Sequence, residues 1–335
     1  MVALKDFFAS DFLLGAAFDG PIPDRLNPAE QALFLQQFNT LTAENCLKPG
    51  RVQPEEGRFT FQDADTLADF ARTHHLHMVG HTLLWHNNCP EWFFKDGEKQ
   101  ASRELVLKRL RAHIHAVVGR YKGTIAGWDV CNEVIADNEK YLRPSHWLET
   151  IGDDFVAQAF RFAHEADPNV LLHYNDYDNE NPIKRDKTLR LLRSLREAGC
   201  RVDAVGLQGH FLLDKVPFGD VEDAIEIYAR EGYQVMITEL DLDVLPFVGP
   251  EAEITQPLSP EQLAPLLLRQ AEQYAKLFSL FRKHRDKITR VTFWNPHDGR
   301  SWRNNWPTKG RTNHPLLFDR ELRPKAAFYA VTGSS

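Results

Sequence analysis

Two glutamates, Glu133 and Glu239, are the residues of this sequence best suited to chemistry. Glu133 closes the stretch WDVCNE, and Glu239 lies in the stretch ITELD, so each comes at the end of an apolar segment. Hydrolysis of a glycosidic bond requires a pair of carboxyl groups flanking the bond, with an oxocarbenium-like transition state between them. The two residues therefore predict hydrolytic chemistry on a sugar, provided that the fold brings them to one site.

Polar side chains also end the other apolar segments. They are Glu44, Asn45, His81, Asn132, Asn175, Asp176, Gln208, His210 and Asp241. Because burying polar groups without partners costs a few kcal/mol or more, such residues need partners or a function. Any one of them could simply begin a solvated loop, but that explanation does not account for polar residues at the end of nearly every segment. Four tryptophans accompany them, namely Trp85, Trp294, Trp302 and Trp306. Indole packs on the apolar face of a sugar ring, and amides and carboxylates bond to its hydroxyls, so the set favours a carbohydrate site.

The elements that must position these residues recur along the chain. Eight apolar segments of strand length lie at residues 12–18, 40–45, 77–84, 125–133, 169–176, 204–210, 235–241 and 290–295. They are continuous rather than alternating, which is typical of parallel strands covered on both faces. Amphipathic segments typical of helices lie between them, at 65–76, 104–118, 154–166, 185–198 and 261–281, with another run after Pro28. Gly199 fits a helix C-terminal cap.

This alternation predicts an α/β fold, a single (β/α)8 TIM barrel over residues 1–335. A doubly wound sheet would carry a Gly-rich phosphate loop after its first strand, whereas the turn there reads FDGPIPDR. Active sites of such barrels lie at the C-terminal ends of the strands. Strands four and seven, which end in Glu133 and Glu239, face each other across that end. The remaining length is assigned to loops, mainly 85–101 and 242–258.

Composition excludes several classes of partner. The chain has 40 Lys and Arg against 47 Asp and Glu, a net charge of −7, and 43% hydrophobic residues. The hydrophobic content argues against disorder. The negative net charge argues against nucleic acid and against an anionic membrane as partners, because a protein that binds either one needs a basic face. No apolar run reaches the roughly 18 residues of a membrane span. The N-terminus lacks the features of a signal peptide. Two locations therefore remain open. The protein is cytoplasmic, or it is secreted or periplasmic and its signal peptide was removed before Met1.

Metal and disulfide chemistry are not expected. Cys46, Cys89, Cys131 and Cys200 are too few and too scattered for a disulfide framework, which predicts free thiols. His74, His75 and His77 cluster in the sequence, but they lie between a predicted helix and the third strand, at the end of the barrel away from the predicted site. The first strand ends without the histidine pair typical of metal-dependent barrel hydrolases. We therefore expect no metal and no cofactor.

Eight segments, in order along essentially the whole chain, resemble glycoside hydrolase family 10, the retaining endo-β-1,4-xylanases. They are LTAENCLK (41–48), GHTLLWH (80–86), WDVCNE (128–133), YNDY (174–177), GLQGH (206–210), ITELD (237–241), TFW with SW (292–294, 301–302), and PLLFD with PKAAF (315–319, 324–328). The resemblance implies hydrolysis of internal β-1,4-xylosidic bonds of xylan or xylo-oligosaccharides with retention of configuration, by double displacement and without a cofactor. We expect a monomer.

The resemblance also assigns catalytic roles. Glu133 is implied to be the general acid/base and Glu239 the nucleophile. Asn132 is implied to bond the 2-OH of the −1 sugar. His210 is implied to hydrogen-bond the nucleophile, with Asp241 orienting it from behind.

Substrate contacts are implied for ten further residues. They are Glu44, Asn45, Lys48, His81, Trp85, Asn88, Tyr177, Gln208, Trp294 and Trp302. Of these, Trp294 and Trp302 resemble the pair that roofs the −1 sugar. Tyr177 is either a platform at subsite +1 or a core tyrosine. The peptide bond between His81 and Thr82 is implied to be cis.

The chain departs from the family pattern at several places, one of which, Cys131 in place of the commoner Val, is expected to be only a small buried side chain. Asn88 stands where the family usually has Gln, which predicts a weaker contact at subsite −2. Asn295-Pro296 replaces the usual Gly-Val, so the loop that follows could take another path. Trp306 is an additional aromatic residue, either an aglycone surface or a loop anchor.

Two other functions remain as alternatives. One is a retaining β-1,4-glucanase, or a glycosidase of mixed specificity, with the same site. The other is a non-catalytic xylan-binding protein on a degenerate barrel, which is disfavoured because Glu133, Glu239 and Asn132 are all present.

Overall fold

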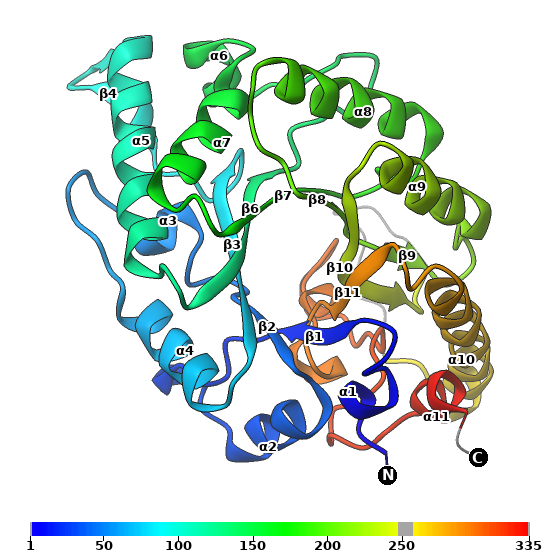
Figure 1. Cartoon of the computed structure of the whole chain (residues 1–335). Helices are drawn as coiled ribbons and strands as arrows, with labels where there is room; N and C mark the ends of the chain where they lie inside the picture. The colour runs from blue at the N-terminus through cyan, green and yellow to red at the C-terminus, as the bar shows by residue number, and fades with distance from the viewer. Residues whose placement is uncertain (1, 247–256, 334–335) are drawn as a thin grey trace.

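The computed structural model describes residues 2–246 and 257–333. Within them, eight parallel strands close into a barrel, seen along its axis in Figure 1. They are β1 (Leu13–Ala17), β2 (Thr40–Thr42), β3 (His77–Trp85), β6 (Ile125–Asn132), β7 (Leu171–Asp176), β8 (Ala204–Leu207), β10 (Gln234–Asp243) and β11 (Ile288–Phe293). Because β11 pairs with both β10 and β1, the sheet has no open edge. The predicted (β/α)8 barrel is confirmed, and each predicted strand overlaps an observed one.

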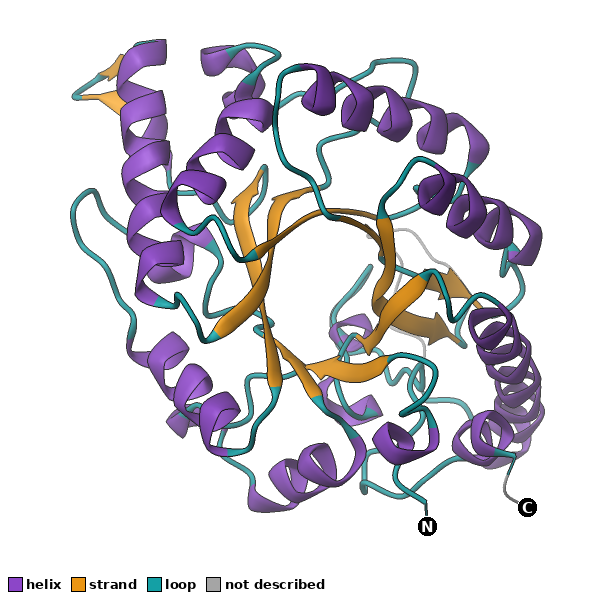
Figure 2. Cartoon of the chain, viewed as in Figure 1, coloured by secondary structure: helices purple, strands orange, loops and turns teal. Residues whose placement is uncertain are grey.

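Helices form a ring around the strands, as Figure 2 shows. The longer ones are α2 (Pro28–Gln37), α4 (Gln62–Thr73), α5 (Arg103–Arg120), α7 (Phe155–Ala166), α8 (Pro182–Glu197), α9 (Phe218–Arg230) and α10 (Pro260–Lys283). Local sequence explains where several begin. The side chain of Asn27 accepts hydrogen bonds at the start of α2, and Ser259 with Gln262 forms a capping box at the start of α10. Gly199 has a φ of 72°, the left-handed conformation of a helix C-terminal cap.

One of the longer helices, α9, was not predicted from the sequence. Helix α9 buries Val221, Ala224, Ile225 and Tyr228, whose spacing of three and four residues is that of an amphipathic helix. The signal was therefore present in the sequence, between the sixth and seventh predicted strands.

Short elements decorate the barrel. They are α1 (Leu4–Phe7), α3 (Pro49–Val52), α6 (His146–Ile151), α11 (Ala326–Thr332), the 3-10 turns η1 (Pro23–Arg25), η2 (Glu91–Phe94), η3 (Asp298–Arg300) and η4 (Trp302–Asn304), and the strands β4 (Lys95–Asp96), β5 (Lys99–Gln100) and β9 (His210–Leu212). The predicted loop 85–101 thus contains η2 and the antiparallel pair β4–β5. In the predicted loop 242–258, β10 continues to Asp243, and residues 247–256 lie outside the described residues.

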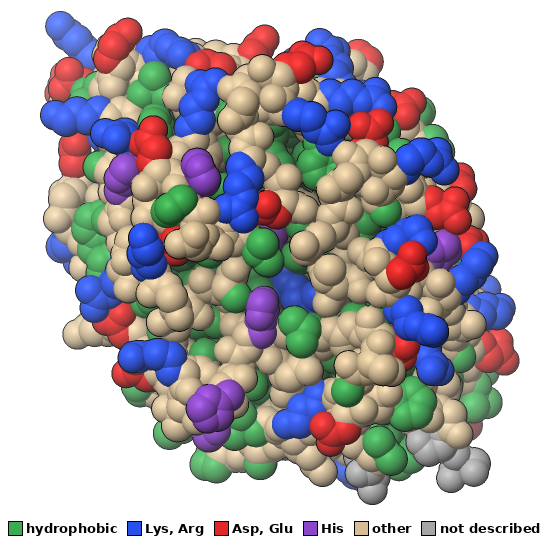
Figure 3. Space-filling view, in the orientation of Figure 1, with side chains coloured by type: hydrophobic (Ala, Val, Ile, Leu, Met, Phe, Trp, Pro, Cys, Tyr) green, Lys and Arg blue, Asp and Glu red, His purple; other side chains and the backbone are tan. Residues whose placement is uncertain are grey.

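The hydrophobic core fills the layer between strands and helices. Trp128, Trp147, Tyr228 and Tyr274 are among its largest fully buried side chains. All four cysteines are free, as predicted; two are buried, and two are partly buried against the core. None of the described helices combines the length and apolar character needed to cross a membrane. On the face shown in Figure 3, acidic and basic side chains are interspersed.

Candidate active site

A cleft of about 660 Å3 lies at the C-terminal ends of the strands. Its walls include most of the residues predicted from the sequence: Glu44, Asn45, Lys48, Trp85, Glu133, Tyr177, Gln208, His210, Glu239, Trp294 and Trp302. A second hollow of similar size, about 670 Å3, is lined by residues from Glu226 to Gln234 and from Asp286 to Thr289, and it contains none of the predicted residues. The cleft is therefore the candidate active site.

Glu133 is held at the end of β6 by both its backbone and its carboxyl group. Its φ of 57° turns the chain sharply after the strand, and its backbone N–H donates to the carbonyl of Asn175 at 3.0 Å. Trp85 Nε1 donates to Glu133 Oε2 at 2.8 Å, and Gln208 Nε2 donates to Oε1 at 3.1 Å. The carboxyl group is therefore oriented by two neighbours while it lines the cleft.

Glu239 is more deeply placed, with 5% of its surface exposed. Asn175 Nδ2 donates to Glu239 Oε1 at 2.7 Å, and His210 Nε2 lies 3.1 Å from Oε2. The same Asn175 amide donates to Asn132 Oδ1 at 2.9 Å, and Gln208 also reaches that oxygen at 3.4 Å. One hydrogen-bond network therefore joins the two glutamates through Asn175, Asn132 and Gln208.

His210 lies between two carboxylates. Its Nε2 faces Glu239, and its Nδ1 lies 3.0 Å from Asp241 Oδ2. Burial alone would lower the pKa of His210, but the charges and hydrogen bonds of Asp241 and Glu239 raise it to about 9. Asp241 is completely buried and also accepts from Trp302 Nε1 and Arg303 Nε, both at 2.7 Å. The histidine is therefore a cation near neutral pH, and it is ion-paired with both carboxylates.

Three polar residues after β2 form one end of the cleft. The backbone N–H of Glu44 donates to buried Asp19 at 3.1 Å, and Lys48 Nζ donates to Asn45 Oδ1 at 3.0 Å. Lys48 Nζ also lies 5.2 Å from the ring centroid of Trp85. Burial, together with the charge of Asp19, raises the pKa of Glu44 to about 7. This end of the cleft can thus offer both hydrogen-bond donors and acceptors.

Some predicted residues lie beneath the cleft or beside it. His81, Asn132 and Asp241 are buried, so they act from below its surface. The peptide bond between His81 and Thr82 is cis, as the resemblance implied. Asn88 is exposed, and its carbonyl accepts from the N–H of Gly50 at 2.7 Å. Among the described residues, Asn87 rather than Asn88 lines the cleft.

The aromatic wall contains three tryptophans. Trp294 is nearly buried, Trp302 is partly buried, and Trp306 is 41% exposed. The ring centroids of Trp302 and Trp306 are 5.0 Å apart. The carbonyl of Trp306 accepts from Arg311 Nη1 at 2.8 Å, so this residue both anchors its loop and extends the wall.

Tyr177 is a cleft residue rather than a core tyrosine. It is partly exposed, and its hydroxyl donates to Asp137 Oδ2 at 2.5 Å and accepts from Arg143 Nη2 at 2.6 Å. Lys184 Nζ lies 3.5 Å from its ring centroid, which fixes the ring further.

The replacement of Gly-Val by Asn295-Pro296 keeps a glycine-like backbone. Asn295 has a φ of 94°, a region that Gly favours and that few other residues adopt. The chain therefore turns at Asn295, and the following η3 and η4 bring Trp302 to the cleft.

The sequence gives no site role to several residues in or below the cleft. Asn175, in β7 and within the YNDY motif, is completely buried and binds Glu239, but the sequence marks it only as a polar residue near a strand end. Arg143 and Arg303 also line the cleft. Arg143 lies in a loop outside the motifs, and Arg303 lies in η4, directly after the SW motif. No local pattern marks either of them as a cleft residue.

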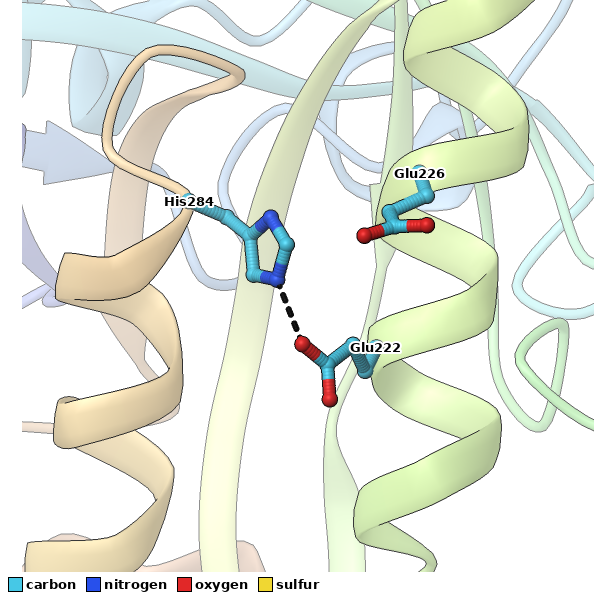
Figure 4. Close-up of side chains that lie close together, drawn as sticks. All are labelled: Glu222, Glu226 and His284. Atoms are coloured by element: carbon cyan, nitrogen blue, oxygen red, sulfur yellow. Dashed lines mark hydrogen bonds and ion pairs between the residues drawn. The ribbon is translucent and has the colours of Figure 1, made fainter.

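One group outside the cleft has the composition of a metal site. Glu222 and Glu226 on α9 face His284 at the end of α10, as Figure 4 shows. His284 Nε2 lies 2.8 Å from Glu222 Oε1, and Lys283 Nζ lies 2.5 Å from the same oxygen. Glu222 is therefore already bonded by two donors, and the group ties two helices together. His74 directly follows α4, His75 comes next, and His77 begins β3.

Comparison with known proteins agrees with this geometry. The model of glycosyl hydrolase family 10 matches residues 3–334. The chain is 41% identical to endo-1,4-beta-xylanase B of Paenibacillus barcinonensis over 99% of this chain and 98% of the relative. It is 43% identical to an endo-1,4-beta-xylanase of Geobacillus stearothermophilus over 98% and 97% of the two chains.

Solved structures give the same result. The crystal structure of xylanase XynB from Paenibacillus barcinonensis, complexed with a conduramine derivative, superposes with a TM-score of 0.93 at 41% identity and covers 100% of this chain and 99% of that one. A mutant relative in complex with xylotriose superposes with a TM-score of 0.92 at 38% identity, over 99% of each chain. The protein is a glycoside hydrolase and belongs to glycosyl hydrolase family 10.

Proposed function

We propose that the protein hydrolyses internal β-1,4-xylosidic bonds of xylan and xylo-oligosaccharides with retention of configuration. The observation that carries the proposal is that Glu133 and Glu239 line one cleft and are joined by one hydrogen-bond network. The relatives named endo-1,4-beta-xylanases and the relative bound to xylotriose support the choice of substrate. The chain would act as a single catalytic domain and a monomer, without cofactor.

In the first step, Glu239 attacks the anomeric carbon while Glu133 donates a proton to the leaving oxygen. His210 and Asn175 hold one oxygen each of the Glu239 carboxylate. They fix its direction before the substrate arrives, so little reorientation is needed at the transition state. The products are a free aglycone and a sugar esterified to Glu239.

In the second step, Glu133 acts as a base on a water molecule. Its negative charge is no longer opposed by a charged Glu239, because that carboxylate is now an ester. Trp85 and Gln208 each donate to one oxygen of Glu133, which keeps the group aimed into the cleft during both steps. The water attacks the anomeric carbon, its proton passes to Glu133, and the bond between that carbon and Glu239 breaks, which restores Glu239 and the original configuration.

Asn132 is oriented for the contact with the 2-OH of the −1 sugar. Its Oδ1 accepts from both Asn175 and Gln208. The amide nitrogen is therefore directed away from them and is available to donate to the sugar. Such a bond strengthens as the oxocarbenium character develops.

The rest of the cleft fits a chain of neutral sugars. In this proposal Trp294 and Trp302 roof the −1 sugar, and Glu44, Asn45 and Lys48 bond the glycone hydroxyls. On the other side of the scissile bond, Tyr177 and Trp306 offer aromatic surface to the aglycone.

Steady-state hydrolysis of xylan and carboxymethyl cellulose by the purified chain tests the substrate. The proposal expects strong preference for xylan, with the β-anomer as the first product in proton NMR. Equal activity on both polymers would favour the alternative β-1,4-glucanase, and activity on neither would favour a binding protein. A first product of the α-configuration would contradict the retaining mechanism.

A further inference from the structure

Asp129 lies below the cleft, between two histidines from neighbouring strands. Parallel pairing sets His81 of β3 opposite Asp129 of β6, and Asp129 opposite His173 of β7. His81 Nδ1 lies 3.0 Å from Asp129 Oδ2, and His173 Nδ1 lies 3.3 Å from Oδ1. All three side chains are buried. Each carboxylate oxygen therefore has one imidazole of its own.

The ring of His173 fills a space that the backbone leaves for it. A Cβ atom at Gly127 would lie 2.4 Å from His173 Cε1, so only glycine at that position admits the ring. On the other side of Asp129, Thr82 Oγ1 donates to its backbone carbonyl at 2.7 Å. The position of the carboxylate is thus fixed by packing and by hydrogen bonds from both neighbouring strands.

The charge of Asp129 determines which nitrogen of each histidine donates a hydrogen bond. Burial alone would raise the pKa of Asp129, but hydrogen bonds from His173 and His81 hold it well below its usual range. Burial lowers the pKa of His173, and the hydrogen bond and charge of Asp129 offset only part of that effect. A carboxylate oxygen can only accept, so the imidazole nitrogen that faces it must carry a proton. His173 thus donates through Nδ1, while its buried Nε2 has no hydrogen-bond partner among the described residues.

His81 connects this group to the cleft. Its ring meets Trp294 edge-on, with centroids 5.2 Å apart, and Trp294 lines the cleft. Since Nδ1 of His81 is engaged by Asp129, Nε2 is the nitrogen left for a substrate hydroxyl. Whether that nitrogen accepts or donates depends on the tautomer, which the position of the Asp129 carboxylate determines.

We propose that His173 is a positioning residue for the hydrolysis: by binding Oδ1 of Asp129 it holds Oδ2 against His81 and so fixes the tautomer and orientation of His81. This deepens the proposed function and rests on it for its effect on rate. His173 itself does not line the cleft among the described residues, so it touches no substrate. It acts only through Asp129 and His81.

Three substitutions separate this role from simple packing. His173→Asn places an amide donor close to the position of Nδ1, whereas His173→Gln places it one methylene further out. His173→Leu removes the donor and leaves Asp129 Oδ1 buried without a partner. We expect kcat/KM on a xylo-oligosaccharide to fall about tenfold in His173→Leu, as expected when a buried acceptor loses its donor, and to stay within about threefold of the parent in His173→Asn. His173→Gln should resemble His173→Leu, and it keeps the proposal testable if the leucine variant does not fold.

Two further measurements distinguish a positioning role from general destabilisation. In the His81→Ala background, His173→Leu should cause no further loss of kcat/KM, because the effect passes through His81. Nitrogen-15 NMR of the full chain should show His81 with its proton on Nδ1 in the parent and in His173→Asn, and a mixture of tautomers in His173→Leu or His173→Gln.

Two results would overturn the proposal. One is an unchanged His81 tautomer in every variant, and the other is an undiminished loss of rate in the His81→Ala background. The NMR arm needs no substrate. If the parent chain failed to hydrolyse xylan, the proposed function would fail while the tautomer experiment still decided the coupling of His173 to His81.

Discussion

Two places in the molecule combine a histidine with two carboxylates, and they differ in almost everything else. In the cleft, His210 lies between Glu239 and Asp241, and both carboxylates are buried. On the outer ring of helices, His284 contacts Glu222, with Glu226 nearby and exposed (Figure 4). Each group is one imidazole with two carboxylates, so the main difference in chemistry must come from their surroundings.

The surroundings differ in how completely each carboxylate is held. In the cleft, Asn175 and His210 occupy the two oxygens of Glu239, and Arg303 and Trp302 bind Asp241 from behind. On the helices, Lys283 shares one oxygen of Glu222 with His284, and water reaches the group. Fixed dipoles stabilise developing charge far better than solvated ones do, because they need no reorganisation. The proposed catalytic group is therefore distinguished by the burial of its carboxylates and by their fixed hydrogen-bond partners, and not by its residue types.

The largest expected contrast is between Glu239 and Glu222, the glutamates that contact the histidine in each of these two groups. Glu239→Ala should lower kcat on xylan by at least about 10^4-fold, because the proposed nucleophile is lost. The matched change Glu222→Ala should leave kcat within about twofold, since Glu222 lies on α9 away from the cleft. Steady-state assays of both variants check this. Comparable losses in the two variants would remove the distinction between the sites.

The second prediction separates the two cleft glutamates. Glu133→Ala should lower the rate on xylan by about 10^2–10^4-fold, the range of general acid–base catalysis, but should still form the glycosyl-enzyme from aryl xylosides with good leaving groups. Azide should then rescue turnover by attacking the intermediate without a base. The measurement is a burst of aryl leaving group, with and without azide. An equal loss of the first step for good and poor leaving groups would show that the roles are misassigned.

The third prediction concerns pH and stability. The pKa of His210 is raised to about 9, so its contribution to folding is fully present below its unfolded value near 6.5 and is lost as pH rises through about 9. Between these values the free energy of unfolding should fall with pH in the parent chain. In His210→Asn this part of the pH dependence should disappear. Urea unfolding at a series of pH values measures it, and an unchanged slope in the variant would contradict the ion-pair arrangement.

The smallest expected effect is at the helix pair. Glu222→Gln should lower the free energy of unfolding by about 1 kcal/mol or less, because Glu222 is partly exposed and its Lys283 partner is exposed, and solvated ion pairs contribute little. Helix α9 would lose part of its tie to α10, while the cleft stays intact. Urea unfolding at neutral pH is sufficient. A loss several times larger would mean that this group is more than a surface tie.

Much of the fold could be predicted from the sequence, because continuous apolar strands and amphipathic helices leave strong local patterns. The alternation placed Glu133 directly after a strand and Glu239 in the C-terminal half of another, as observed for β6 and β10. By contrast, no local sequence pattern predicts that Arg303 binds Asp241. The two residues come from separate segments that closure of the barrel brings together. Likewise Asn87, not Asn88, lines the cleft, because the direction of a side chain in a loop depends on turns that composition does not specify.

The most direct test of the account is to trap the covalent intermediate. A 2-deoxy-2-fluoro xylobioside with a good leaving group forms the glycosyl-enzyme and slows its hydrolysis, because fluorine destabilises the oxocarbenium-like transition state. Mass spectrometry of the intact chain and of its peptides then locates the sugar. The account predicts one sugar adduct per chain, on Glu239. An adduct on another carboxylate would contradict the account. So would continued hydrolysis of the fluorinated xylobioside with no loss of activity and no adduct on any residue.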